Sequence, residues 1–286
     1  MANPMEGGGT EYIPLDSGAP VYVFADVENS RLVLENVLRQ WIKGNQRDQI
    51  LDRTGWAIAA IYPEKRYIQA VAWGKYPAIQ AGFAFTFDKN WKKKKSPSKH
   101  SYWYSERDGL SVSLNASQAY IAAAMQHNAD SSTDPFYTPP GTELPEGFFE
   151  FTRGAILTIL LNEPAVPVNR LLKSMDMPID IPAEKIFVSL FPLPAGVEAA
   201  EDNNLYEVLF RIQTPTASQA RALVTIISFA KPYIMIAAPG GKVDFRTLAA
   251  LLFANTPVQD GKNLTLRITS ISEKEIALLL SLFSVY

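Results

Sequence analysis

Apolar residues are most concentrated between residues 55 and 87, where three short apolar runs follow one another. These runs, 55–62, 67–74 and 82–87, are rich in aromatic and β-branched residues and are separated by Pro, Gly and Lys. Such residues favour strands, and such interruptions favour turns. The pattern therefore predicts three adjacent antiparallel strands in the middle of a sheet.

Further elements are predicted on both sides of these runs. An alternating segment predicts a strand at 21–27, and an apolar stripe after it predicts a helix over 30–43 that ends at Gly44. Strands are also predicted at 102–104 and 110–114. Asn115 with Gln118 resembles a capping box, which predicts a short helix over 116–126.

The second half repeats this order of elements. Helices are predicted at 164–175, after Thr214 and Pro215, and after a capping box of Ser272 and Glu275. The succession strand, helix, strand, strand, helix is that of a split βαβ unit. We therefore predict an α+β protein with two similarly built domains, each an antiparallel sheet covered on one face by helices, and interpret them as duplicated ferredoxin-like units. The strands predicted in the second half are 155–161, 186–191, 205–212 and 264–271.

Composition shifts set the boundaries of these domains. Residues 1–19 include three consecutive glycines and predict a flexible N-terminal tether. The stretch 127–145 is rich in Ser, Asp, Thr and Pro, which predicts a linker. The first domain is therefore expected at 20–146 and the second at 147–286.

Composition also excludes several kinds of site. The chain has no cysteine, which excludes disulfides, thiolate metal ligands and a cysteine nucleophile. Its two histidines, His100 and His127, disfavour a histidine-rich metal centre or a catalytic triad. We predict no catalytic residue, no metal and no cofactor, and hence a protein that is not an enzyme. A hydrolase that uses Asp26 or Glu28 is the alternative, although their position after a strand favours a role at a helix start.

The candidate binding site is a lysine-rich hairpin over residues 88–104. Its lysines repel one another and cannot be buried together, so we expect an exposed loop at the hairpin tip. The neighbouring aromatic side chains supply flat faces, and this combination suits anionic lipid headgroups, glycan strands or single-stranded nucleic acid. In the alternative interpretation, the lysines protect a sheet edge against aggregation. The candidate residues are Trp91, Lys92, Lys93, Lys94, Lys95, Lys99, Tyr102, Trp103 and Tyr104.

Charge and the N-terminal segment direct the functional hypothesis. The formal net charge of -2 gives no global field that would recruit nucleic acid. No apolar run reaches the roughly 20 residues that span a membrane. No basic segment followed by an apolar run opens the sequence, so we expect either a cytoplasmic protein or a mature envelope protein.

The leading hypothesis is a non-enzymatic bacterial protein of the cell envelope with a binding or structural role. It is expected in the periplasm or on a lipid tether, as a mature lipoprotein whose lipidated cysteine is not in this sequence. Its expected partners are an anionic membrane surface, a glycan or another protein. The alternative is a cytoplasmic module that binds a polyanion or nucleic acid through the lysines and aromatic residues of the hairpin.

Overall fold

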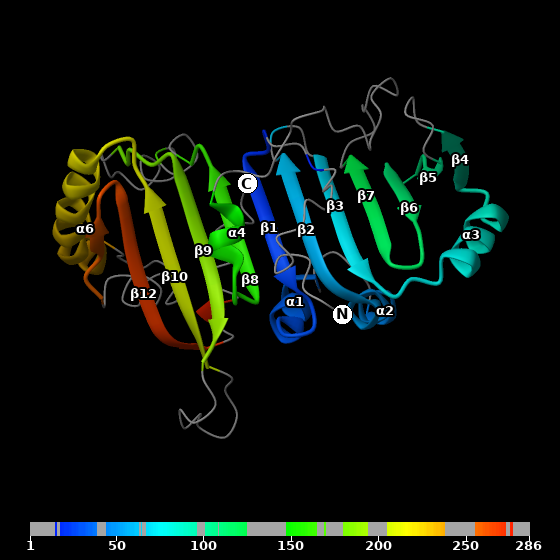
Figure 1. The fold of residues 1–286 in the computed structure, drawn as a ribbon, viewed down its shortest axis with the longest axis horizontal. Coiled ribbons are helices and arrows are strands. Elements are labelled where there is room, and N and C mark those ends of the chain that lie inside the picture. Colours follow the sequence, from blue (N-terminus) through cyan, green and yellow to red (C-terminus); the bar gives the residue numbers. More distant parts are fainter. Residues whose placement is uncertain are drawn as a thin grey trace. The chain divides into compact units, whose positions relative to one another are not determined.

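Antiparallel strands dominate the computed structural model of the chain (Figure 1). The chain divides into two compact units, Met1–Arg153 and Gly154–Tyr286. The structure describes residues 15, 18–38, 44–62, 64, 67–95, 101–107, 109–124, 147–164, 169, 180–193, 205–237, 255–272 and 275–276.

The first unit is an antiparallel sheet with helices between some of its strands. Its described strands lie in the order β1-β2-β3-β7-β6-β5-β4, and each neighbouring pair is antiparallel. In chain order the elements are β1 (Val21–Asp26), α1 (Arg31–Leu38), α2 (Gly44–Arg53), β2 (Thr54–Tyr62), β3 (Tyr67–Gly74), α3 (Ala78–Phe87), β4 (Trp91–Lys95), β5 (Ser101–Ser105), β6 (Leu110–Leu114), β7 (Gln118–Ala124) and α4 (Phe148–Thr152).

The core of this unit includes one face of the strands β1 to β3. Phe24 pairs with Ile58, which pairs with Val71, and all three side chains are buried. Tyr22 on the same face meets Phe148 of α4 edge to face, with ring centroids 6.1 Å apart. Alternation along the strands brings these side chains to a single face, because successive residues point to opposite sides.

The chain leaves β1 through a turn that Asp26 holds. The backbone N–H of Asn29 donates to one carboxylate oxygen of Asp26 at 3.1 Å, and the Asn29 side-chain amide donates to the other at 2.7 Å. The backbone N–H of Ser30 donates to the Asp26 carbonyl at 2.9 Å, and α1 begins at the next residue. Asp26 therefore has the helix-start role that its position in the sequence favoured.

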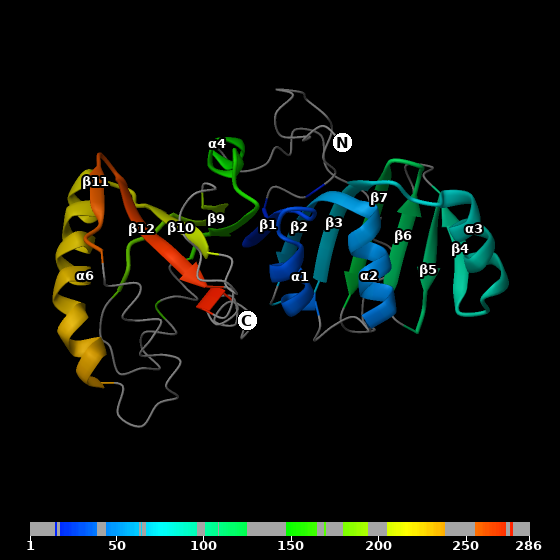
Figure 2. The same ribbon diagram turned by 90° about the horizontal axis from the view of Figure 1, so that it is seen from below.

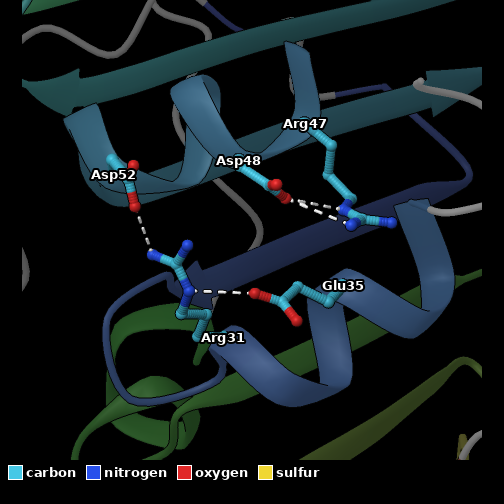
Figure 3. A network of polar contacts seen from close by, with 5 residues as sticks. All are labelled: Arg31, Glu35, Arg47, Asp48 and Asp52. Atoms are coloured by element: carbon cyan, nitrogen blue, oxygen red, sulfur yellow. Dashed lines mark hydrogen bonds and ion pairs between the residues drawn. The ribbon is translucent and has the colours of Figure 1, made fainter. Parts of the chain in front are cut away.

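One ion pair connects α1 to α2, and further pairs lie within each helix (Figure 3). The Arg31 guanidinium donates to Glu35 in α1 at 2.9 Å and to Asp52 in α2 at 2.7 Å. Its hydrogen bond to Asp52 raises the pKa of Arg31, because the partner favours the charged form. A second pair, Arg47 with Asp48, lies within α2 at 3.1 Å. Partly exposed pairs of this kind contribute about 0–1 kcal/mol each, so they stabilise the unit only slightly.

The second unit is an antiparallel sheet with one long described helix. Its strands lie in the order β8-β9-β10-β12-β11. Figure 2 shows α6 beside β11 and β12, where Ala220 and Leu223 of α6 form a buried cluster with Leu264 of β12. The elements are β8 (Leu157–Asn162), β9 (Lys185–Pro192), β10 (Leu205–Gln213), α6 (Ala217–Ala237), β11 (Val258–Asp260) and β12 (Asn263–Ser272).

The predicted fold class is wrong. The structure is mostly antiparallel sheet, with 48% strand against 26% helix, and it is not a pair of helix-covered ferredoxin-like domains. The error comes from the first unit, where four antiparallel strands, β4 to β7, follow α3 without a described helix between them. A split βαβ unit needs a helix in that part of the chain, so the order on which the duplication was based is not present.

Two predicted elements have the opposite secondary structure. The run 82–87 belongs to the helix α3, although its alternating phenylalanines predicted a strand. The expected helix over 116–126 is the strand β7 preceded by a turn. In that turn, the Asn115 side-chain oxygen accepts the backbone N–H groups of Ser117 at 2.9 Å and Gln118 at 2.7 Å. An Asn side chain makes the same local bonds in a tight turn as at a helix start.

Several other elements lie where the pattern placed them. Strands occupy most of the ranges predicted at 21–27, 55–62, 67–74, 110–114, 186–191, 205–212 and 264–271. The capping box of Ser272 and Glu275 is confirmed, since the Ser272 N–H donates to the Glu275 carboxylate at 2.8 Å. Part of the helix predicted over 30–43 is α1 (Arg31–Leu38), residues 39–43 lie outside the described residues, and Gly44 belongs to α2. Most of the predicted tether and helix 164–175 and all of the linker 127–145 lie outside the described residues.

Candidate functional site

The lysine-rich segment is a strand, so the prediction of a loop at this position is wrong for residues 91–95. β4 pairs with β5 in an antiparallel ladder, in which Trp91 is opposite Ser105 and Lys95 is opposite Ser101. β4 is the terminal strand in the described sheet order of the first unit. In this terminal strand Lys92, Lys93 and Lys95 are exposed and Lys94 is half-buried, so the lysines reach water without a loop. Lys99 and His100 lie outside the described residues.

The pleat of the sheet divides the candidate residues between two faces. Successive side chains of a strand alternate, and residues paired across an antiparallel ladder share a face. Lys93 is opposite Trp103, whereas Lys92 is opposite Tyr104 and Lys94 is opposite Tyr102. We call the first set the α3 face (Trp91, Lys93, Lys95 and Trp103) and the second set the far face (Lys92, Lys94, Tyr102 and Tyr104).

The α3 face takes its name from an aromatic contact with the helix. The ring of Phe85 in α3 lies 4.5 Å from the ring of Trp91 and 5.7 Å from that of Trp103. The Nζ atom of Lys93 lies 5.7 Å from the centroid of the Trp103 ring, at the outer limit of a cation–π contact. The helix therefore packs against the two tryptophans on this face of the sheet.

The far face keeps its lysines in separate contacts. Lys94 places its Nζ atom 4.1 Å from the centroid of the Tyr104 ring, which is a cation–π contact. Lys92 forms an ion pair with Glu106 at 2.7 Å, and both side chains are more than half exposed. The candidate cluster is thus brought together in the sheet, but as two chemically different halves.

The helix α3 presents an apolar stripe to solvent. Ile79, Phe83 and Phe87 are 75%, 61% and 82% exposed, and no residue of α3 is buried. These three residues follow at i, i+4 and i+8, so they lie along one side of the helix. Phe85 lies about 160° around the helix from Phe83, given about 100° per residue. The stripe therefore points away from the sheet that Phe85 contacts.

Contacts at both ends hold α3 in place. Before the helix, the Tyr76 hydroxyl lies 3.1 Å from the Thr54 hydroxyl of β2, and the Tyr76 backbone N–H donates to the Ala116 carbonyl at 3.1 Å. The Tyr76 side chain is partly buried, and this burial raises its pKa because it disfavours the charged form. After the helix, the Asp88 N–H donates to the Ala84 carbonyl at 3.1 Å, and the Trp91 N–H donates to the Asp88 carbonyl at 3.0 Å.

The stripe was not predicted from the sequence, because the pattern of residues 82–87 also fits a strand. The informative signal was the spacing of four between Ile79, Phe83 and Phe87, which is typical of one side of a helix. The alternation of Phe83, Phe85 and Phe87 fits a strand as well as the spacing of four fits a helix. In the helix this alternation instead sends Phe85 inward and the other two phenylalanines outward.

Nothing in the described residues forms a metal centre or a spanning helix. Their Asp and Glu side chains include no group of three that could hold a metal ion, and both histidines lie outside the described residues. None of the helices in the described ranges combines the length and the hydropathy of a membrane-spanning segment. The absence of a cofactor and of enzymatic activity stays a prediction.

Comparison with known proteins gives one family and one fold. The family described as outer membrane-associated lipoprotein TP0453 matches residues 12–131, a range that contains β1 to β7 and α3. No curated protein sequence matches the chain.

Three solved structures of TP0453 have a similar fold. Crystal form III aligns with a TM-score of 0.60 at 14% identity, covering 94% of this chain and 96% of that one. Crystal form I aligns with a TM-score of 0.59 at 16% identity, covering 96% of this chain and 98% of that one. Crystal form IV aligns with a TM-score of 0.57 at 15% identity, covering 93% of this chain and 94% of that one. At such identities the likeness to these structures concerns the fold. The family match supports an envelope-associated bacterial lipoprotein and confirms the predicted location in the cell envelope.

Proposed function

We propose that this protein is a non-enzymatic envelope lipoprotein that contacts a membrane surface by inserting the apolar stripe of α3 into the lipid interface. One observation carries the proposal, namely that Ile79, Phe83 and Phe87 are mostly exposed on one side of a single helix. Single exposed apolar residues are common on protein surfaces, but a contiguous stripe is typical of an interaction site. The location in the cell envelope favours lipid as the partner.

The size of the stripe fits shallow insertion. A helix of 10 residues is about 15 Å long, which is too short to cross a bilayer and suits a position in the interfacial plane. Full burial of a Phe or Ile side chain contributes about 1.5–3 kcal/mol. Three partly buried side chains therefore supply several kcal/mol, enough to strengthen the attachment of a lipid-tethered protein.

Residues around α3 have the composition of a membrane interface. Trp91 and Trp103 lie beneath the helix, and tryptophan is enriched at the level of lipid headgroups. Lys75 before the helix and Lys89 after it are both exposed. Lysines at these positions extend their charged ends to the headgroups while their aliphatic parts stay on apolar surface.

The first test removes the stripe. The variant Phe83→Ser/Phe87→Ser is expected to bind vesicles of phosphatidylcholine at least about 30-fold more weakly than the unchanged protein, because two large apolar side chains no longer enter the interface. Vesicle sedimentation at several lipid concentrations measures this affinity. Neither side chain is buried in the fold, so the melting temperature should stay within a few degrees of the unchanged protein.

A matched control makes the same kind of change in the second unit. Val258 of β11 is an apolar residue with 68% exposure, and Val258→Ser should leave vesicle binding unchanged. Equal binding by the α3 variant and the unchanged protein would contradict the proposal, as would equal losses in the α3 and Val258 variants.

Other partners have less support. The envelope location removes the basis for the cytoplasmic polyanion alternative. No observation on the described residues favours a glycan or a protein partner over a membrane surface.

A further inference from the structure

The four consecutive lysines of β4 are divided between the two faces of the sheet. Lys93 and Lys95 belong to the α3 face, and Lys92 and Lys94 belong to the far face. The helix lies on only one of these faces, because Phe85 contacts Trp91 and Trp103 there. Two positive charges therefore accompany the apolar stripe, and two point away from it.

The charges of the α3 face are placed to reach a bilayer that α3 has entered. A helix with its side chains is about 10–12 Å wide, and a partly buried interfacial helix extends about 5–10 Å into the boundary between headgroups and acyl chains. Side chains that leave the sheet beside the helix then extend toward the headgroup layer. Lys93 and Lys95 are both exposed. The Nζ atom of Lys93 lies 5.7 Å from the centroid of the Trp103 ring, and tryptophan is a residue suited to the depth of the lipid headgroups.

The lysines of the far face are placed to contribute less to the attraction of an anionic membrane. Lys92 is paired with Glu106, which cancels its charge locally, and Lys94 is half-buried on Tyr104. Their side chains leave the opposite side of the sheet from the helix. The thickness of the sheet separates Lys92 and Lys94 from a bilayer that contacts the stripe. Their charges therefore lie farther from the bilayer than the electrostatic screening length of about 8–10 Å at moderate salt.

We propose that Lys93 and Lys95 recognise the phosphate groups of anionic lipids, so that the α3 site selects anionic over neutral membrane surface. This inference rests on the proposed function of α3 and adds to it the class of lipid. A lysine close to an anionic surface contributes roughly 1 kcal/mol, so the pair accounts for a preference of about 30-fold. The ligand is a lipid surface and not a free anion, because the lysines act together with the inserted stripe.

The test compares two double variants of equal charge. Lys93→Ser/Lys95→Ser and Lys92→Ser/Lys94→Ser each remove two positive charges from the same strand. Their affinities are measured by sedimentation with vesicles of phosphatidylcholine alone and with vesicles that also contain phosphatidylglycerol. The α3-face variant is expected to bind the anionic vesicles about 30-fold more weakly, whereas the far-face variant loses at most a few-fold. Both variants should bind the neutral vesicles as the unchanged protein does.

The outcomes separate this inference from the function on which it rests. If the unchanged protein binds neither kind of vesicle, the proposed function of α3 fails. If it binds both kinds equally, or if the two variants lose anionic binding equally, only the lipid selectivity of Lys93 and Lys95 fails. A further arm adds inorganic phosphate, with sodium chloride of the same ionic strength as the control. If phosphate abolishes vesicle binding and chloride does not, the lysines bind a free anion and the inference is overturned.

Discussion

At the scale of single residues, Gly74 is the position where the backbone leaves no space. A Cβ atom at Gly74 would lie 1.9 Å from the carbonyl oxygen of Arg53, which is backbone and cannot move aside. The same carbonyl accepts the N–H of Lys75 at 2.8 Å, so the chain end of β3 is held tightly against the start of β2. Glycine is required here by close approach.

Replacement of Gly74 by Ala should therefore be costly. We expect Gly74→Ala to lower the free energy of unfolding by about 3 kcal/mol or more, measured by urea denaturation, because the backbone of β2 and β3 must separate. Gly82 of α3 is the matched control, since a Cβ atom there meets nothing within 4 Å. Gly82→Ala should leave stability unchanged or raise it by up to about 1 kcal/mol, as alanine favours helix. Similar losses in both variants would show that the close approach at Gly74 is not the cause.

At the scale of elements, α3 is joined to the sheet by few side-chain contacts. Phe85 is the residue of α3 whose aromatic ring meets the two tryptophans of the α3 face. Each aromatic pair contributes about 0.5–1.5 kcal/mol beyond the burial of its area. We therefore expect the helix to open more easily than the strands β2 and β3, which are paired on both sides.

Loss of Phe85 should release the helix without unfolding the sheet. In Phe85→Ala we expect amide hydrogen exchange to rise by about tenfold or more across residues 78–87 and to stay unchanged in β2 and β3. Phe87→Ala is the control, because that side chain is 82% exposed and should leave exchange in α3 nearly unchanged. Faster exchange in β2 and β3 as well would mean that Phe85 supports the whole unit.

The elements also show what could be predicted from the sequence. The strand β2 was found because its buried residues Ile58, Ala60 and Tyr62 alternate with partly exposed ones and so mark a single apolar face. Residues 82–87 were misassigned because phenylalanines two apart fit a strand, and a helix with no buried face gives no core pattern against which to test that fit. The lysines of β4 were identified as a surface site, but the division into two faces needed the register with β5. The apolar stripe of α3 was missed for the same reason as the helix that carries it.

At the scale of the whole molecule, charge acts locally. The formal net charge of -2 does not attract an anionic membrane, so any attraction comes from the lysines grouped around α3. Grouped charges act over a short distance, because the screening length falls from about 10 Å at 0.1 M salt to about 3 Å at 1 M.

Salt should therefore affect the choice of lipid more than the fold. Between 0.1 M and 1 M sodium chloride, we expect the preference for phosphatidylglycerol vesicles over neutral vesicles to fall by about tenfold or more, while binding to neutral vesicles persists. The free energy of unfolding should change by only about 1 kcal/mol, since every described ion pair is at least partly exposed and such pairs contribute little. A lipid preference that survives 1 M salt would contradict an electrostatic origin.

The position of β4 at the end of the described sheet order has a further consequence for crowding. Proteins attached to a membrane are concentrated in two dimensions, where an open strand edge is a template for pairing with the next molecule. Two copies of β4 brought edge to edge would place like charges beside one another, since residues 92–95 are all lysines. We therefore expect this strand to disfavour edge-to-edge pairing of copies into extended sheets, so that copies held close together on a membrane would stay separate.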